Sequence, residues 1–301
     1  MTTSSRQTHQ HSTRSRTHKM ALKLGTTSLN KLYLGSTQIN KAYLGAGVLF
    51  SSAFDPLSLF TGGHDGVWYD PSDLTTLFQD SAEPPITPVT AAGQTVGTML
   101  DKSGNGNHAR QTTAAQRPTY QTGSGLHWLS FEGIDDTMFT SAIDLTSTDK
   151  ISIFAGQRKL SDAAFSTLLG FSLNSNNNNG AFALTAPADF NSPDYAVRSR
   201  GTSVSFIQSP PSFAAPHSAA LTMLADIGAP SHTFRINGVL ISTSVASQGT
   251  GNYGDHALFI GSRAGTSFHY TGRLHGMIIV GKTASATEIT DTEAYITGKT
   301  I

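Results

Sequence analysis

Short runs in which apolar and polar residues alternate recur along residues 126–281, and they predict a protein built mainly of β-strands. Alternation with a period of two places successive side chains on opposite faces of a sheet, so each run fits a strand with one buried face. Turn-forming residues separate the runs at a spacing typical of a β-sandwich. The predicted strands are LHWLSFEG (126–133), KISIFAGQRK (150–159), STLLGFSL (166–173), AFALTA (181–186), YAVRSR (195–200), SVSFIQ (203–208), AALTMLAD (219–226), HTFRINGVLIS (232–242), ALFIGSR (257–263) and GRLHGMIIVG (272–281).

A single helix is predicted near residue 290. Ser285 and Glu288 form a capping box, in which each side chain accepts a hydrogen bond from the other residue's backbone amide. An inward stripe follows at the i, i+3, i+7 spacing, formed by Ile289, Thr292 and Ile296. Gly298 stands where a left-handed cap would end the helix.

Residues 24–50 repeat a ten-residue unit, L-G-x-x-x-(L/I)-N-K-x-Y, nearly three times. Its short alternating runs predict strands of about four residues, which have too few apolar side chains to bury a core of their own. Two interpretations are open: a hairpin folded back on the main domain, or a module that assembles with copies of itself or attaches to another protein. The second predicts an oligomer, a trimer or a pentamer. Its assembly residues would be Leu32, Tyr33, Leu34, Gly35, Tyr43, Leu44 and Gly45.

The composition agrees with strands and polar turns. Only 13% of the residues are charged and four are glutamate, whereas long helices favour Glu, Lys and Ala. A net charge of zero gives no basis for a nucleic-acid partner, and no run of about 18 apolar residues is present to insert into a membrane. The chain has no cysteine, so disulfides, thiolate nucleophiles and cysteine-based zinc sites are excluded.

The first twenty residues are predicted to be a disordered basic tail, or a leader upstream of Met20, because they lack acidic residues and any apolar run. A basic arm that touches nucleic acid or a partner is the alternative. The predicted organisation continues with the repeat module at 21–50, a linker at 51–65 and one large domain at 66–301.

The loop DKSGNGNHA (101–109) is the densest polar cluster of the chain. Asp101, Asn105, Asn107 and His108 would hold a sugar hydroxyl, or alternatively form a turn that satisfies its own hydrogen bonds. Calcium is the one metal that such oxygens would suit, and the spacing does not supply the six to eight ligands it needs. We therefore predict no metal and no cofactor.

Glu132, Asp135 and Asp136 form the best carboxylate group for a glycan-cleaving enzyme, which needs two carboxyl groups about 5 Å or about 6.5–9.5 Å apart. Strand geometry before the turn at Gly133 predicts that these acids fan apart. No nucleophile elbow, phosphate loop or dinucleotide fingerprint is present either. We therefore predict no catalytic residues, and assign Asp135 and Asp136 only to sugar contacts.

Aromatic rings and amide groups are the usual partners of sugars, and Tyr253 with Asn252 lies in a glycine-rich loop, QGTGNYGDH, where we expect exposure. Trp128 alternates with Leu126 and Leu129, so it is predicted to belong to the core.

Several segments resemble known families. The two KxYLG units, at 31–35 and 41–45, resemble the N-terminal segment of many bacteriophage and prophage virion proteins. Four further segments resemble, in the same order, parts of LamG-like, concanavalin A-like jelly-roll domains: LDKSGNGNHARQTTAAQRPTY (100–120), LSFEGIDDTMF (129–139), FRINGVLIS (234–242) and GRLHGMIIVGKTASATEITDTEAYI (272–296). The resemblance implies an all-β concanavalin A-like jelly-roll sandwich with a short C-terminal helix, preceded by a small β-repeat module.

The same resemblance implies a phage structural protein of the fibre or spike type, whose lectin-like domain binds host-surface polysaccharide. Its other expected partners are copies of itself and other virion proteins, bound through the repeat. Its expected location is the virion, assembled in the host cytoplasm and acting outside the cell. The alternatives are a passive capsid or tail decoration protein without glycan binding, a polysaccharide-degrading enzyme, and a bacterial surface adhesin.

Overall fold

The computed structural model describes residues 54–301 and, before them, the short segments 23–24, 27–28, 32–34, 37–39, 41–44 and 47–51. The chain divides into two units, residues 1–54 and 55–301.

The first unit contains three separate antiparallel strand pairs that follow the sequence repeat. They are β1 (Lys23–Leu24) with β2 (Thr27–Ser28), β3 (Leu32–Leu34) with β4 (Thr37–Ile39), and β5 (Lys41–Leu44) with β6 (Gly47–Ser51). Of the predicted assembly residues, Leu32, Tyr33 and Leu34 lie in β3, and Tyr43 and Leu44 lie in β5. Gly35 and Gly45 lie outside the described residues. Assembly through this module stays a prediction.

The second unit is a β-sandwich of two antiparallel sheets. Nine strands form the first sheet in the order β18-β17-β16-β15-β22-β13-β10-β9-β8. Their bounds are Leu77–Phe78 (β8), Thr98–Met99 (β9), Ala109–Arg110 (β10), Met138–Asp144 (β13), Thr167–Phe171 (β15), Phe182–Thr185 (β16), Ala196–Arg200 (β17), Val204–Gln208 (β18) and Asp255–Ile260 (β22).

The second sheet has the order β11-β12-β23-β14-β19-β20-β21, and the short strand β7 also pairs with β23. The bounds are Gly66–Tyr69 (β7), Thr119–Gly123 (β11), Leu126–Glu132 (β12), Lys150–Lys159 (β14), His217–Asp226 (β19), Ser231–Ile236 (β20), Val239–Ser244 (β21) and Thr271–Val280 (β23). Three short 3-10 helices lie in the connections, at Pro56–Phe60, Leu74–Thr76 and Ala114–Gln116. The predicted all-β jelly-roll sandwich is confirmed.

The core fills the space between the sheets with alternate side chains from each strand. Phe171 and Phe182 stack with their ring centroids 4.6 Å apart, on neighbouring strands of the nine-stranded sheet. Ile153, Leu221 and Phe234 are fully buried in this core on the eight-stranded sheet. Burying each such side chain contributes about 1.5–3 kcal/mol, so the strands are held mainly by this shared interior.

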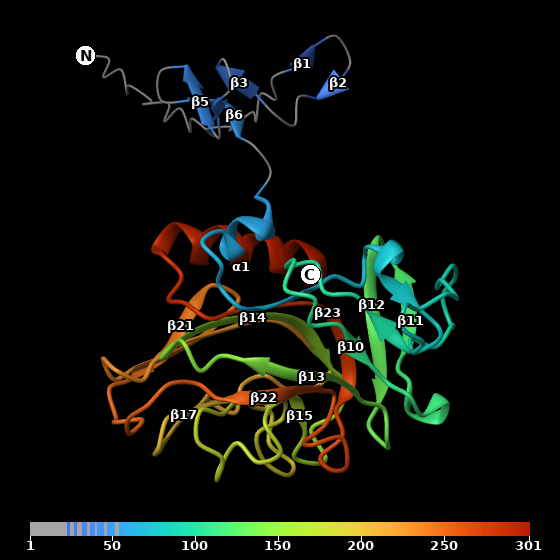
Figure 1. The fold of residues 1–301 in the computed structure, drawn as a ribbon, viewed down its shortest axis with the longest axis vertical. Coiled ribbons are helices and arrows are strands. Elements are labelled where there is room, and N and C mark those ends of the chain that lie inside the picture. Colours follow the sequence, from blue (N-terminus) through green and yellow to red (C-terminus); the bar gives the residue numbers. More distant parts are fainter. Residues whose placement is uncertain are drawn as a thin grey trace, which may run out of the picture. The chain divides into compact units, whose positions relative to one another are not determined.

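One helix, α1 (Ala286–Thr300), lies across the outer face of the eight-stranded sheet, over β14, β19 and β23 (Figure 1). The predicted capping box is present, with the Ser285 hydroxyl accepting from the Glu288 amide. The predicted stop at Gly298 was wrong, because the helix continues to Thr300. Thr300 is buried, and its side chain packs close to Gly156 in the sheet below, so tertiary contact extends the helix past the glycine.

The segment before β7 packs on the sandwich. Asp55 caps the short helix Pro56–Phe60, and Leu59 within it is fully buried. This stretch lies inside the predicted linker 51–65, and its burial places it with the domain.

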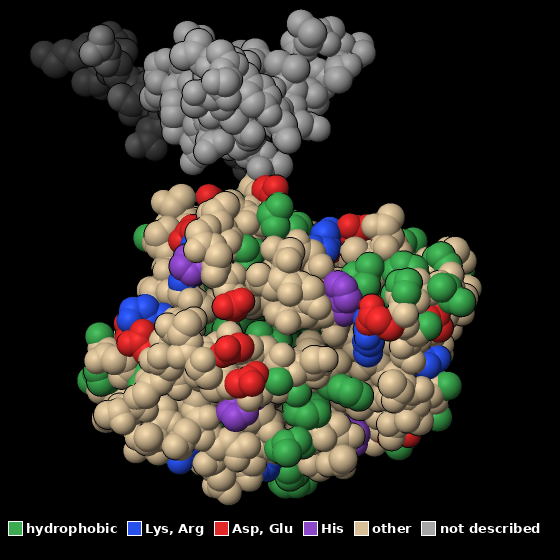
Figure 2. Space-filling view, viewed as in Figure 1, with side chains coloured by type: hydrophobic (Ala, Val, Ile, Leu, Met, Phe, Trp, Pro, Cys, Tyr) green, Lys and Arg blue, Asp and Glu red, His purple; other side chains and the backbone are tan. Residues whose placement is uncertain are grey.

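The surface of the second unit carries few charges, and on the face in view both signs occur in small scattered groups (Figure 2). No helix in the described part of the chain is long and apolar enough to cross a membrane.

Candidate functional site

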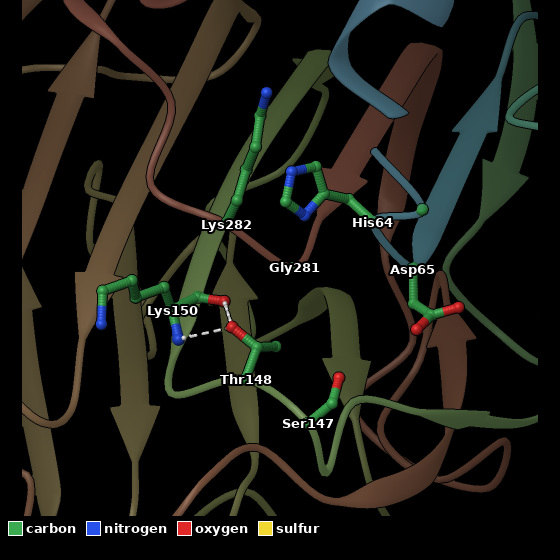
Figure 3. A pocket seen from close by; sticks show the side chains of 8 residues that line it. His64, Asp65, Ser147, Thr148, Lys150, Gly281 and Lys282 are labelled. Atoms are coloured by element: carbon green, nitrogen blue, oxygen red, sulfur yellow. Dashed lines mark hydrogen bonds between the residues drawn. The ribbon is translucent and has the colours of Figure 1, made fainter. Parts of the chain in front are cut away.

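A polar pocket of about 260 Å³ opens at one end of the sandwich (Figure 3). Three segments line it: residues 63–65 before β7, residues 147–150 at the start of β14, and Gly281 with Lys282 after β23. They are far apart in the sequence, and the pairing of strands brings them together.

These segments lie together because two of them adjoin strands that pair with β23, and the third follows β23 itself. β23 pairs with β7 on one side, with Gly66 opposite Val280, and with β14 on the other, with Ser152 opposite Val280. A side chain at position 66 would place its Cβ 2.0 Å from the Ile279 carbonyl oxygen, so only glycine permits this approach. The Gly281 amide then donates to the Asp65 carbonyl at 2.8 Å, which fixes the two rims of the pocket.

Three side chains at the pocket have unused hydrogen-bonding groups. The carboxylate of Asp65, the imidazole of His64 and the hydroxyl of Ser147 make no hydrogen bond or ion pair with any residue in the range 54–301. Asp65 and Ser147 are exposed, and His64 is half-buried. These groups are therefore available to a ligand.

The two lysines of the pocket are already neutralised. Lys150 Nζ lies 2.6 Å from an Asp149 oxygen and 3.3 Å from an Asp226 oxygen, and Lys282 Nζ lies 2.6 Å from Glu288. The hydrogen bond that Lys150 donates to the Asp149 carboxylate is the main reason that the pKa of Lys150 is raised. Both ammonium groups point away from the free side chains (Figure 3), so the pocket offers an acceptor carboxylate rather than a free cation.

Asn252 and Tyr253 lie behind the turn that lines this pocket. The Asn252 amide donates to the Thr146 carbonyl at 2.6 Å, and the Tyr253 backbone amide donates to the Thr148 carbonyl at 2.9 Å. The expectation that Tyr253 is exposed was wrong: its ring is 1% exposed, and its hydroxyl lies 2.7 Å from the Ser199 hydroxyl. The glycines around it form the loop, while the ring turns inward against Phe182.

The loop at 101–108 is a support for β7. Asp101 is buried and accepts from the amides of Trp68, Ser103 and Asn107. The Asn107 and Asn105 side chains donate to the Gly66 carbonyl, at 2.9 and 3.3 Å, and Asn105 also donates to the His64 carbonyl.

His108 closes this loop by accepting from the Asp101 amide at 3.0 Å. The four predicted residues therefore hold β7, the strand that follows the pocket segment 63–65, and none of them lines the pocket itself.

Glu132, Asp135 and Asp136 lie at the other end of β23, where Glu132 is opposite Thr271. The expectation that they fan apart was wrong, because one oxygen of each lies within 4.8 Å of the others. The turn brings them together: the Glu132 amide donates to Asp136 at 3.0 Å, and a hydrogen bond with Asp135 raises the pKa of Glu132. Burial raises the pKa of Asp136 to about 7.

Trp128 is not a core residue, contrary to expectation. It is half-buried on the outer face of β12, where the Arg273 guanidinium lies 4.3 Å from its ring centroid. Leu129, which points inward, is fully buried, so the alternation was assigned to the wrong face.

His64, Asp65 and Ser147 were missed by sequence reasoning. His64 and Asp65 follow a glycine-rich turn, and Ser147 lies between threonines in another. The sequence predicts a linker for the first turn and a loop between strands for the second. The only signal was a His-Asp pair directly before a strand.

No protein-family model matches the chain, and no curated protein sequence matches it. Among solved structures, the binding domain of botulinum neurotoxin serotype G superposes with a TM-score of 0.51 at 11% identity, over 65% of this chain and 48% of that one. A structure of botulinum neurotoxin type C, whose cell entry depends on interaction with two ganglioside molecules, gives a TM-score of 0.52 at 12% identity, over 77% of this chain and 51% of that one.

A carbohydrate-binding module (CBM40) of a Ruminococcus gnavus sialidase, bound to α2,3-sialyllactose, is more distant, with a TM-score of 0.40 at 19% identity over 56% of this chain and 97% of that one. That similarity is too low to carry an argument. The chain spans about half the length of the two toxin chains that it matches better. At these identities the comparison shows a shared sandwich fold.

Proposed function

We propose that this protein is a lectin-like virion protein that binds host-surface carbohydrate, and that the pocket at Asp65 is a sugar site. The observation that carries the proposal is the set of unused groups on Asp65, His64 and Ser147 around a space of about 260 Å³. Fold similarity alone does not establish function, so the pocket has to supply the specificity.

The chemistry of the pocket suits a neutral sugar. A free carboxylate accepts hydrogen bonds from adjacent hydroxyl groups, and hydrogen bonds to a charged group contribute about 1.5–3 kcal/mol. The imidazole of His64, in the same segment as Asp65, and the Ser147 hydroxyl, in a second segment, add further partners. The volume is close to the lower end of the range of about 300–1,000 Å³ typical of ligand pockets, which favours one or two sugar rings.

The similarity to the toxin binding domains supports this proposal in a limited way. One of those toxins depends on gangliosides, which carry sugars, and its sandwich resembles the one described above. The similarity makes glycan binding a reasonable use of this fold and does not identify the residues.

The virion setting rests on the two KxYLG units, which resemble the N-terminal segment of bacteriophage and prophage virion proteins. Three short strand pairs with little core of their own suit a module completed by copies of itself or by another virion protein. We expect a trimer or a pentamer for the full-length chain. The native mass of the full-length protein, compared with that of a chain beginning at Ser51, tests this part.

The sugar site is tested by binding full-length protein to an array of bacterial surface polysaccharides and neutral oligosaccharides. Asp65→Asn keeps the shape of the side chain and removes its charge, and we expect the affinity for the preferred ligand to fall about tenfold or more. Asp291→Asn is the matched control, because Asp291 lies on α1, outside the pocket.

Unchanged affinity in Asp65→Asn would place the site elsewhere. No binding of the unaltered protein to any polysaccharide would contradict the proposal and favour a passive decoration protein.

A glycan-cleaving activity is the second candidate, because Glu132, Asp135 and Asp136 lie together and Asp136 has a pKa of about 7. A general acid needs such a raised pKa. Against it, the hydrogen bond between Glu132 and Asp135 joins two carboxyl groups that would have to flank a glycosidic oxygen. New reducing ends released from host polysaccharide, and lost in Glu132→Gln, would establish the enzyme.

A further inference from the structure

A second, smaller pocket lies on the outer face of the nine-stranded sheet. On this face one row of cross-strand partners runs through five strand pairs: Phe206, Arg198, Ala183, Gly170, Phe259 and Phe139. Partners in an antiparallel ladder point to the same side, so these side chains share one surface. The two smallest, Gly170 and Ala183, lie in the middle of the row and leave a depression between larger neighbours.

The depression has a volume of about 20 Å³. Gly170 and Ala183 line its floor, and its sides include Arg198, Arg263, Ser175 and Asn176. A space of about 10–15 Å³ holds one water molecule, so this pocket admits a group the size of a carboxylate and excludes a whole sugar ring.

Arg198 faces this pocket without a counter-charge. Its guanidinium carbon lies 4.5 Å from the ring centroid of Phe206 and 6.0 Å from that of Phe165. These stacking contacts fix the group but use none of its five N–H donors. Within residues 54–301, the guanidinium of Arg198 makes no hydrogen bond and no ion pair.

Arg263 is held at the same pocket from a different loop. One of its nitrogens donates to the Asn174 side chain at 2.7 Å, and its guanidinium lies 5.6 Å from the Phe268 ring centroid. It makes no ion pair with the described residues either. Burial, and then the positive charge of Arg263, lower the pKa of Arg198, so the two like charges are close enough to repel each other.

We propose that this pocket binds the negatively charged group of an acidic saccharide. The planar guanidinium of an arginine can donate two parallel hydrogen bonds to the two oxygens of a carboxylate, or to two oxygens of a sulfate ester. A bound anion would also relieve the repulsion between the two guanidinium groups.

The surroundings of the pocket indicate a saccharide rather than a free ion. Phe206 and Phe268 do not line the pocket but stack on its two arginines, and at 42% and 36% exposure they offer apolar surface to the carbon-bearing face of a sugar. Ser175 and Asn176 supply hydrogen-bonding groups beside them. An inorganic anion would use the arginines and leave the rings uncovered.

The choice of a saccharide rests on the proposed glycan binding, but the two pockets are separate. One offers a carboxylate to a neutral sugar, and the other offers two cations to an acidic one. Substitutions in each pocket should therefore affect different ligands.

The test is titration calorimetry of the full-length protein with acidic saccharides and their uncharged counterparts. Trigalacturonic acid is compared with its methyl ester, sialyllactose with lactose, and a sulfated disaccharide with the unsulfated one. We expect at least one acidic member to bind about tenfold or more tightly than its counterpart, and the binding to weaken as salt is raised. The pair that responds identifies uronate, sialate or sulfate as the source of the charge.

Arg198→Gln should lower that affinity about tenfold or more, and Arg263→Gln, on a separate loop, should do so independently. Arg273→Gln is the matched control. Arg273 also stacks on an aromatic ring beside a second arginine, Arg158, but it lies on the other sheet, outside the pocket. Asp65→Asn should leave binding of the acidic saccharide unchanged.

Equal affinity for charged and uncharged members, or an equal loss in Arg273→Gln, would overturn the proposal. Binding of inorganic sulfate without any acidic saccharide would mean an adventitious ion only, and would also overturn it. Absence of neutral-sugar binding by the unaltered protein, with binding of an acidic saccharide present, would count against the proposed function at Asp65 and leave the proposal for this pocket intact.

Discussion

The two outer faces of the sandwich use small residues in opposite ways. On the eight-stranded sheet, Gly156 lies beneath α1, and a Cβ at that position would come within 2.2 Å of the Thr300 hydroxyl and 3.1 Å of Ile296. On the nine-stranded sheet, a Cβ at Gly170 would meet only the Thr167 methyl group, at 3.6 Å. The first glycine lets a helix approach the sheet, and the second leaves space open to a ligand.

The role of a glycine in a strand therefore depends on what covers that position of the sheet. A glycine weakens a strand wherever it occurs, so each position needs a compensating reason. Under α1 the compensation is packing, since Ile296 is 1% exposed there. On the other face no helix lies over the sheet in the described part of the chain, and the compensation we propose is binding.

The largest expected effect comes from filling the space under the helix. Gly156→Val should lower the free energy of unfolding by about 3 kcal/mol, because the added methyl groups force α1 away from the sheet. Gly170→Val is the matched control and should change stability by less than about 1 kcal/mol, while weakening binding of the acidic saccharide. Urea unfolding measures both, and equal losses would break the comparison between the faces.

The next effect concerns His275, which is buried on the covered face beside Trp128. Burial lowers its pKa to about 4, opposed by its hydrogen bond with the His127 carbonyl. An unfolded histidine titrates near 6.5, so the stability that neutral His275 provides is complete above that pH and is lost as the pH falls toward 4.

The expected loss from His275 between pH 7.5 and 4.5 is on the order of 2 kcal/mol. His275→Gln keeps a donor for the His127 carbonyl and cannot be protonated. Its unfolding free energy should therefore fall less over this range than that of the unaltered protein. A parallel pH dependence in both would show that His275 is not the group responsible.

A smaller effect is expected at the start of the helix. Ser285→Ala removes the side chain that accepts from the Glu288 amide and should cost about 1 kcal/mol. Thr287→Ala, in the exposed first turn, should stay within about 0.5 kcal/mol. Thermal unfolding measures the difference, and binding on the nine-stranded sheet should be unaffected. A change in that binding would show that the two faces are coupled.

Much of the fold could be predicted because its signals are local. The run at 150–159 became β14 with the same bounds, and the run at 272–281 became β23 shifted by one residue. Ser285 and Glu288 lie three residues apart, so the capping box depends on the neighbouring sequence alone. The prediction failed where tertiary contacts set the end of the helix. The helix continues past Gly298 to Thr300 because Thr300 packs close to Gly156 of the sheet beneath it.

The candidate sites could not be predicted, because they depend on register between distant strands. Arg198 and Phe206 are eight residues apart, but Gly170 joins them only through two further strand pairings. Asp65 and Ser147 line the same pocket only because β7 and β14 both pair with β23. The polar residues that the sequence made conspicuous, such as Asp101, bind backbone groups of their own loop and of β7 and do not line a pocket.

The position of β23 in the chain has a consequence for biosynthesis. Its partners β7, β12 and β14 all precede residue 160, whereas β23 itself spans Thr271–Val280. During synthesis β7, β12 and β14 therefore lack the strand that pairs with all three of them. β23 becomes available only after more than a hundred further residues have been added. Contacts of such long range are formed slowly, and the unpaired strand edges are exposed to aggregation in the meantime. The repeat module leaves the ribosome long before β23, so the assembly that we propose for it would begin while each sandwich is still incomplete.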